Sequence, residues 1–159
     1  MIAERSRTIA AGHKAVWRLV RDPRSLPRWW PRVERVEGVS EDGWTTVLRS
    51  ERGRVVRADW RLEAEEGGGR RAWSQRLAGT PFERVISERR VEARVESAGT
   101  AATTVTLELR QRSRRLGRLG DFVLRGPARR ELDTALAGLA RELEARPAST
   151  ASSDRSTGS

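Results

Sequence analysis

The sequence predicts an α+β fold in which a curved antiparallel sheet of about seven strands wraps around one long C-terminal helix. Two observations support this prediction. Between residues 33 and 112, apolar residues recur at alternate positions between turn-forming runs, the period of strands with one buried face. From Leu132 to Leu143 they recur every three to four residues, the period of an amphipathic helix. An apolar sheet face and an apolar helix stripe can bury each other.

The first thirty residues predict a short strand and two short helices. Residues 2–10 form the strand, and residues 13–21 carry apolar side chains at helical spacing. This helix ends before Pro23, because proline drives the residue that precedes it out of the helical region. A second short helix is expected over residues 24–30.

Six further strands are expected, each bounded by residues that favour turns. Their ranges are 33–39, 44–50, 54–65, 71–78, 82–96 and 101–112. In the strand over 82–96, Val85, Ser87, Arg89 and Val91 share one face, and the opposite face is almost wholly charged. This pattern indicates an antiparallel meander with one buried and one solvated face.

The last part of the chain predicts the long helix and a tail. An earlier helical piece precedes Gly126-Pro127, and we expect a kink or break there because proline interrupts helix hydrogen bonding. Residues 147–159 are rich in Ser, Thr and Ala with no large apolar residue, which predicts a disordered tail after a domain of residues 1–146.

Composition narrows the class of protein. The 159 residues suit one domain, and the absence of Cys excludes disulfides and thiolate metal sites. No apolar stretch approaches the roughly 18 residues of a membrane span, and the charged N-terminus does not resemble a signal peptide, so we expect a cytoplasmic protein. His13 is the only histidine, and a zinc site would need two or three further nitrogen or sulfur ligands, so no metal is expected. No other cofactor is expected, and no residue is assigned a catalytic role.

The net charge of +10 is concentrated in one segment. Eight Arg and a single acid, Asp121, lie between Arg110 and Arg130. Almost every basic residue of the chain is Arg, a bias that a GC-rich genome also produces. The segment is therefore either a solvated surface or a patch that binds an anionic partner. In the second case, the patch consists mainly of Arg112, Arg114, Arg115 and Arg118.

The opening of the chain resembles a known family. Ala15-Val16-Trp17-Arg18-Leu19-Val20-Arg21-Asp22-Pro23, followed by Leu26-Pro27-Arg28-Trp29-Trp30-Pro31, is similar to the start of actinobacterial polyketide cyclase/dehydrase-type proteins. These belong to the START-like, helix-grip superfamily (SRPBCC), and the resemblance covers about residues 4 to 145. It implies an internal cavity for a small hydrophobic ligand, with the two short helices beside its mouth.

Aromatic residues are the first candidates for that cavity. The chain has six Trp and no Tyr. Trp60 and Trp73 lie on strand faces expected to point inward, where they either line the cavity or fill the core. Trp29 and Trp30 are adjacent on a short helix, so their side chains diverge by about 100° and one of them can rim the entrance.

Arg89 is the most informative polar candidate, because it stands with Ser87 on an otherwise apolar face. A buried guanidinium needs a partner, so Arg89 either pairs with an inward acid or binds an anionic or carbonyl group of a ligand. Alternatively, a bulge near Ser87 turns it outward. Gln75 and Thr46 are weaker candidates of the same kind.

These observations favour a binding protein for a small hydrophobic, aromatic or polycyclic molecule, acting as a monomer or homodimer. The alternative is an aromatase/cyclase acting on a poly-β-ketone chain, for which the absence of Tyr and of a well-placed His is unfavourable. A third possibility is an anionic-surface or nucleic-acid binder that uses the Arg110–Arg130 segment. No motif of sequence-specific nucleic-acid recognition accompanies that segment.

Overall fold

The computed structural model describes residues 1–115 and 117–145. Its strands are β1 (Ile2–Ile9), β2 (Val33–Glu37), β3 (Gly43–Arg49), β4 (Val55–Glu66), β5 (Arg70–Gln75), β6 (Ile86–Ser97) and β7 (Thr103–Ser113). Its helices are α1 (His13–Arg21), α2 (Leu26–Trp29) and α3 (Gly117–Glu144), with short 3₁₀ turns η1 (Pro23–Ser25) and η2 (Pro81–Arg84). The predicted tail over 147–159 lies outside the described residues.

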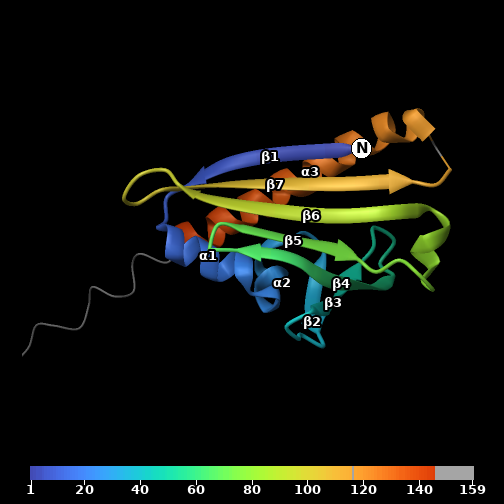
Figure 1. Ribbon diagram of the computed structural model, residues 1–159, viewed down its shortest axis with the longest axis horizontal. Helices are drawn as coiled ribbons and strands as arrows, with labels where there is room; N and C mark the ends of the chain where they lie inside the picture. Colours follow the sequence, from blue (N-terminus) through green and yellow to red (C-terminus); the bar gives the residue numbers. More distant parts are fainter. Residues whose placement is uncertain (116, 146–159) are drawn as a thin grey trace, which may run out of the picture.

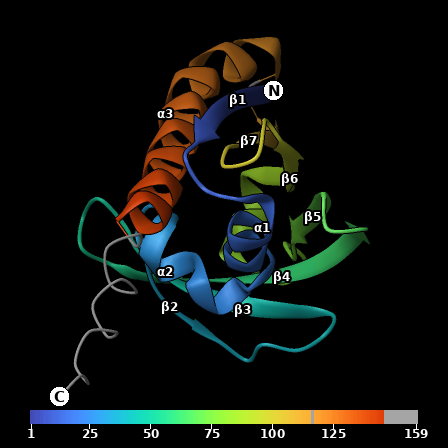
Figure 2. The ribbon, with the colours of Figure 1, turned by 90° about the vertical axis from the view of Figure 1, so that its left-hand side faces the viewer.

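The strands form one antiparallel sheet in the order β1-β7-β6-β5-β4-β3-β2. Consecutive strands pair as hairpins, and only β1 crosses the fold to pair with β7. Figure 2 shows that the sheet curls strongly, with α3 along one side of the curl and α1 and α2 at one end. In Figure 1 the same two helices lie at the left end of the sheet. The predicted fold class and order of elements are confirmed.

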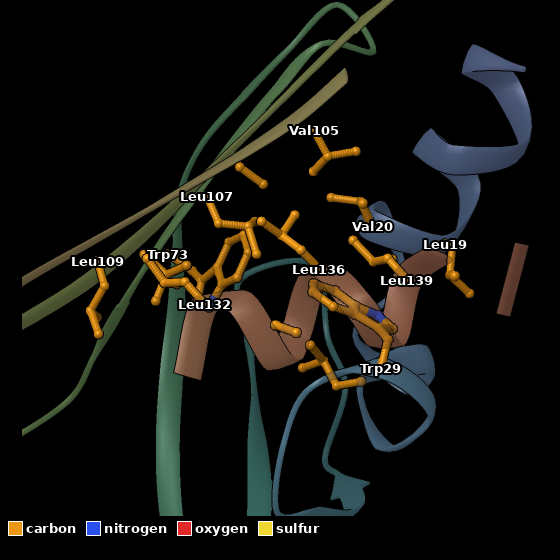
Figure 3. Packing of buried hydrophobic residues seen from close by; sticks show 14 of the residues in the cluster. Leu19, Val20, Trp29, Trp73, Val105, Leu107, Leu109, Leu132, Leu136 and Leu139 are labelled. Carbon is orange, nitrogen blue, oxygen red and sulfur yellow. The ribbon is translucent and has the colours of Figure 1, made fainter. Parts of the chain in front are cut away.

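The core lies between the concave face of the sheet and α3. Leu132, Leu136 and Leu139 of α3 are fully buried, and the alternate residues of β7 that predict the inner face are buried with them (Figure 3). Each such side chain stabilises the fold by about 1.5–3 kcal/mol through the apolar surface it removes from water. The helical and strand periods therefore meet in one cluster, as the sequence predicts.

The strand expected over 82–96 is shorter than predicted. Pro81 begins η2 rather than a strand, because its fixed φ and missing N–H suit the first position of a helical turn. Val85 is half exposed, and β6 begins at Ile86. The pairing of β6 with β7 shifts between Ile86 and Glu88, which is a β-bulge at the start of β6.

Of the kink or break expected at Gly126-Pro127, the break is wrong, because α3 is one helix from Gly117 to Glu144. Proline removes the hydrogen bond to the carbonyl of Val123, but it does not end the helix here. The buried stripe begins immediately afterwards with Ala128 and holds the following turns on the sheet. Within the described residues, no helix is long and apolar enough to cross a membrane.

Candidate ligand cavity

A cavity of about 620 Å³ lies between the concave face of the sheet and α3. This volume is within the range of pockets that hold one small organic molecule. Strands β3 to β6 supply one wall, and the α2–β2 connection and the middle of α3 supply the other. Aliphatic lining comes from Leu26, Val33, Leu48, Val56, Ile86 and Val91.

Four Trp side chains form the aromatic part of the wall: Trp30, Trp44, Trp60 and Trp73. The rings of Trp30 and Trp73 meet edge to face at 6.4 Å between centroids, and those of Trp44 and Trp73 are 6.1 Å apart. Such pairs are stabilising and hold the rings in place. Sequence reasoning missed Trp44, although its alternation with Thr46 and Leu48 on β3 was a usable signal.

Polar groups of the wall are mostly satisfied within it. Trp60 Nε1 donates a hydrogen bond to Thr46 Oγ1 at 2.9 Å, so the indole and the hydroxyl satisfy each other. The side-chain amide of Gln75 lines the cavity and makes no hydrogen bond to any described residue. Gln75 is therefore available to a bound molecule.

Arg89 lines the cavity and is held there by two partners from other elements. Its Nη1 donates to Gln111 Oε1 and its Nη2 to Glu131 Oε1, both at 2.7 Å. Trp30 Nε1 also donates to Glu131 Oε1, at 3.1 Å. The bulge expected near Ser87 exists, but it leaves Arg89 inward, and the inward acid among the alternatives is Glu131. Arg89 and Glu131 are one-fifth and one-quarter exposed, so the pair is only partly desolvated.

Glu131 is the polar cavity residue that sequence reasoning missed. It directly precedes the buried stripe residue Leu132 on α3 and follows the run of Arg that ends at Arg130. The one signal in the sequence was its place at the flank of the apolar stripe, where a side chain can reach the sheet. Glu131 Oε1 accepts both hydrogen bonds, and Oε2 accepts none from the described residues.

Two predicted cavity residues lie elsewhere. Trp29 is 2 % exposed and belongs to the core, where its Nε1 donates to Ser25 Oγ at 2.9 Å and its backbone lies against Gly138 of α3. Ser87 is exposed, because the bulge turns Ile86 inward in its place. Ser87 instead donates a weak hydrogen bond to the carbonyl of Arg112 at 3.4 Å.

The exposed residues of the lining mark the rim of the cavity. They come from both sides of the opening: Arg32 from the α2–β2 connection, Arg49 from the end of β3, Glu51 from the β3–β4 connection, and Pro127, Arg130 and Thr134 from α3. Arg32 Nη2 donates to Glu51 at 2.6 Å, and this hydrogen bond lowers the pKa of the Glu51 carboxyl, with a smaller contribution from Arg130. The rim is therefore charged, whereas the wall behind it is apolar and aromatic.

Arg71 supports the wall from the end covered by α1. It is buried, lies over the ring of Trp44 at 5.6 Å from the centroid, and forms an ion pair with Glu65. Burial lowers the pKa of the Arg71 guanidinium, and the charge of Glu65 opposes this effect. The cation–π contact and the ion pair hold Trp44 against Trp73.

The basic patch lies away from the cavity wall. Arg112 is at the end of β7 and forms an ion pair with Glu88 at 3.2 Å. Arg114 and Arg115 lie in the connection to α3, and Arg118 is in its first turn. Within residues 1–115 and 117–145, these three Arg make no ion pair.

The curled sheet, the long C-terminal helix and the cavity between them define a START-like protein with the helix-grip fold. The chain belongs to the family described as polyketide cyclase/dehydrase and lipid transport, whose model matches residues 2–144. Its family and fold are those of ligand-binding SRPBCC proteins. No curated protein sequence matches the chain significantly.

Several solved structures share the fold at low sequence identity. A START superfamily protein from Mycobacterium smegmatis is 12 % identical, with a TM-score of 0.75 and coverage of 91 % of this chain and 97 % of that one. An aromatase/cyclase (Zhui) from Streptomyces is 17 % identical, with a TM-score of 0.72 and coverage of 92 % and 94 %. A protein from Thermus thermophilus is 19 % identical, with a TM-score of 0.70 and coverage of 91 % and 98 %. At these identities the likeness concerns the fold.

Proposed function

We propose that the protein binds one small aromatic or polycyclic molecule in this cavity. The observation that carries the proposal is the combination of four indole rings with a volume of about 620 Å³. Flat ring systems should gain the most binding free energy from such a wall, because their offset and edge-to-face contacts with indole rings add to the burial of apolar surface. Membership of the polyketide cyclase/dehydrase and lipid transport family supports the same class of ligand.

The polar groups suggest what the ligand carries. Arg89 is neutralised by Glu131, so the pair is better suited to a neutral hydroxyl or carbonyl than to a carboxylate. Glu131 Oε2 can accept a hydrogen bond from a hydroxyl, and the amide of Gln75 can donate to a carbonyl. The ligand we propose is therefore an apolar ring system bearing a hydroxyl or carbonyl group at one edge.

Fluorescence of the Trp residues tests this proposal. We expect 1-hydroxypyrene to quench the protein's Trp emission saturably, and 1-methylpyrene, which lacks the hydroxyl, to bind about tenfold more weakly. Glu131→Gln removes the charged acceptor and should reduce this preference. Native mass spectrometry of the protein as expressed should also show a co-purified molecule.

A variant that fills the cavity supplies the control. Ala58 lines the cavity on β4, and Ala58→Phe places a ring in the space that the ligand would occupy. Ile2→Phe adds the same ring at a half-exposed site on β1, outside the cavity lining. Loss of quenching in Ala58→Phe alone supports binding in the cavity. Equal quenching in both variants, or no saturable quenching by either pyrene, would refute it.

An aromatase/cyclase reaction is the second candidate function. The observation that favours it is the Glu131 carboxylate in the cavity, since proton transfer during aldol closure or dehydration needs such a group. A linear poly-β-ketone thioester would then be converted to a ring by the native protein. Glu131→Gln should abolish the conversion and retain binding of 1-methylpyrene. No conversion by the native protein would exclude this candidate.

A further inference from the structure

The first part of α3 presents an apolar stripe to solvent. Leu119, Phe122 and Val123 are 81 %, 78 % and 65 % exposed, the most exposed large apolar residues among those described. They are spaced i, i+3 and i+4, so they lie on one face of the helix. In Figure 1 this part of α3 (orange) lies near the N-terminus and the end of β7. Single exposed apolar residues are ordinary, but three on one face indicate an interaction surface.

Arginines flank the stripe in the sequence. Arg114, Arg115 and Arg118 precede it, Arg125 and Arg129 follow it, and none of them makes an ion pair with a residue that the structure describes. The one acid nearby, Asp121, is 3.0 Å from the N-terminal ammonium, which already balances its charge. The stripe and these five Arg, hereafter the basic apolar segment, combine exposed apolar surface with uncompensated positive charge.

We propose that the basic apolar segment docks the protein on the surface of an anionic lipid bilayer. Leu119, Phe122 and Val123 would enter the boundary between headgroups and acyl chains, and the Arg side chains would bind lipid phosphates. Each guanidinium near an anionic leaflet adds to the attraction. The anionic bilayer would then contact both the apolar stripe and the positive charge of the basic apolar segment.

Two other kinds of partner, a second copy of the chain and a nucleic acid, match the basic apolar segment less well. A second copy of the chain would bring its own five Arg against these five, so apolar contact would be opposed by like-charge repulsion. A nucleic acid would accept the Arg side chains but leave the apolar stripe facing phosphates, where its burial gains little. A lipid bilayer offers anionic groups and an apolar interior at adjacent depths.

The docked segment lies close to the cavity rim on the same helix. Val123 is one helical turn before Pro127, which is a rim residue, and Arg130 is one turn further on. Docking would therefore bring the opening near the bilayer, where apolar molecules concentrate. This link to ligand entry rests on the proposed function, whereas docking itself does not.

Co-sedimentation of the full chain with vesicles tests docking. We expect binding to vesicles of equal parts phosphatidylglycerol and phosphatidylcholine, and little binding to pure phosphatidylcholine. Arg114→Glu with Arg115→Glu and Arg118→Glu should weaken binding by about a hundredfold or more. Leu119→Ser with Phe122→Ser should weaken it by at least about tenfold, because less apolar surface enters the bilayer.

The matched control reverses three other exposed arginines: Arg7→Glu, Arg18→Glu and Arg61→Glu, on β1, α1 and β4. Its net charge equals that of the first triple variant, so retained binding would assign the effect to the basic apolar segment. Equal loss in the control, or equal binding to neutral vesicles, would overturn the proposal. Circular dichroism and 1-hydroxypyrene quenching check that each variant folds, and they report on the cavity separately from docking.

Insertion of the stripe can be observed directly. The chain has no Cys, so Phe122→Cys can be labelled selectively with a nitrobenzoxadiazole dye. Its emission should shift to shorter wavelength with anionic vesicles, whereas the same label at Val85→Cys, also exposed, should not shift. A dimer that Leu119→Ser disperses would overturn docking in favour of a second copy. Salt-sensitive retention on duplex DNA without vesicle binding would overturn it in favour of nucleic acid.

Discussion

The two halves of α3 have similar apolar spacing and opposite surroundings. After Pro127, the stripe that includes Leu132 and Leu139 is fully buried against the sheet. Before Pro127, the stripe of Leu119, Phe122 and Val123 faces solvent. The difference arises because the three exposed side chains lie on the outer face of the helix, whereas Gly120 and Leu124 of the same half face the protein. Apolar periodicity thus indicates that a helix face will be covered, but it does not say by what.

Removing a buried leucine should produce the largest effect on the free energy of unfolding. Leu132→Ala leaves a cavity in the core cluster, and we expect a loss of about 2–5 kcal/mol. Urea denaturation followed by circular dichroism measures it. A loss below about 1 kcal/mol would show that the second half of α3 packs more loosely than its burial indicates.

Gly138→Ala tests how closely α3 approaches α2. A Cβ at this position would lie 2.4 Å from the carbonyl oxygen and 2.9 Å from the Cα of Trp29, both backbone atoms that cannot rotate away. We expect α2 to shift and the protein to lose about 1–3 kcal/mol, despite the better helix propensity of Ala. Gly126→Ala, on the same helix and with nothing within 4 Å of the added Cβ, is the control and should not destabilise the protein. An equal loss in both variants would contradict the close approach.

Most arginines of the sheet have acidic partners, unlike those of the first half of α3, so the stability that these pairs contribute should depend on pH. Glu92 accepts hydrogen bonds from Arg70 and Arg90, and the bond from Arg70 is the largest cause that lowers the Glu92 pKa below its ordinary value of 4.5. A depressed carboxyl pKa stabilises the folded state above the unfolded pKa. This contribution, about 1 kcal/mol, is lost as pH falls below about 4.5 through the folded-state pKa.

Urea denaturation at several acidic pH values measures this loss. Glu92→Gln should flatten the decline of stability in that range. Glu96→Gln, exposed on the same strand, should leave the decline unchanged. An identical pH profile for Glu92→Gln and the native protein would contradict the role of the network.

The smallest effect is expected in the first half of α3. Phe122→Ala removes a large side chain that touches little, so the free energy of unfolding should change by less than about 0.5 kcal/mol in the absence of vesicles. The same urea measurement as for Leu132→Ala gives a direct comparison. A loss of about 2 kcal/mol or more would mean that Phe122 is covered in solution.

Much of the cavity wall could be predicted, because strand alternation assigns faces locally. Trp60, Trp73, Gln75 and Arg89 all lie on the predicted inner faces and line the cavity. The prediction failed at Ser87, where one bulge reverses the alternation. It left open which of Trp29 and Trp30 lines the cavity, because a four-residue helix does not say which of two adjacent indoles meets α3.

By itself, the sequence determined the order of elements, the buried face of each strand, the stripe of the long helix and the position of the basic segment. These depend on local periods of two and 3.6 residues and on charge. Only the tertiary structure decided that Glu131 meets Arg89, 42 residues away, and that α3 continues through Pro127. Both features depend on packing between segments that are distant in the sequence, and no local sequence pattern specifies that packing. The predicted helix-grip architecture therefore holds as a whole, while its polar site was decided by packing.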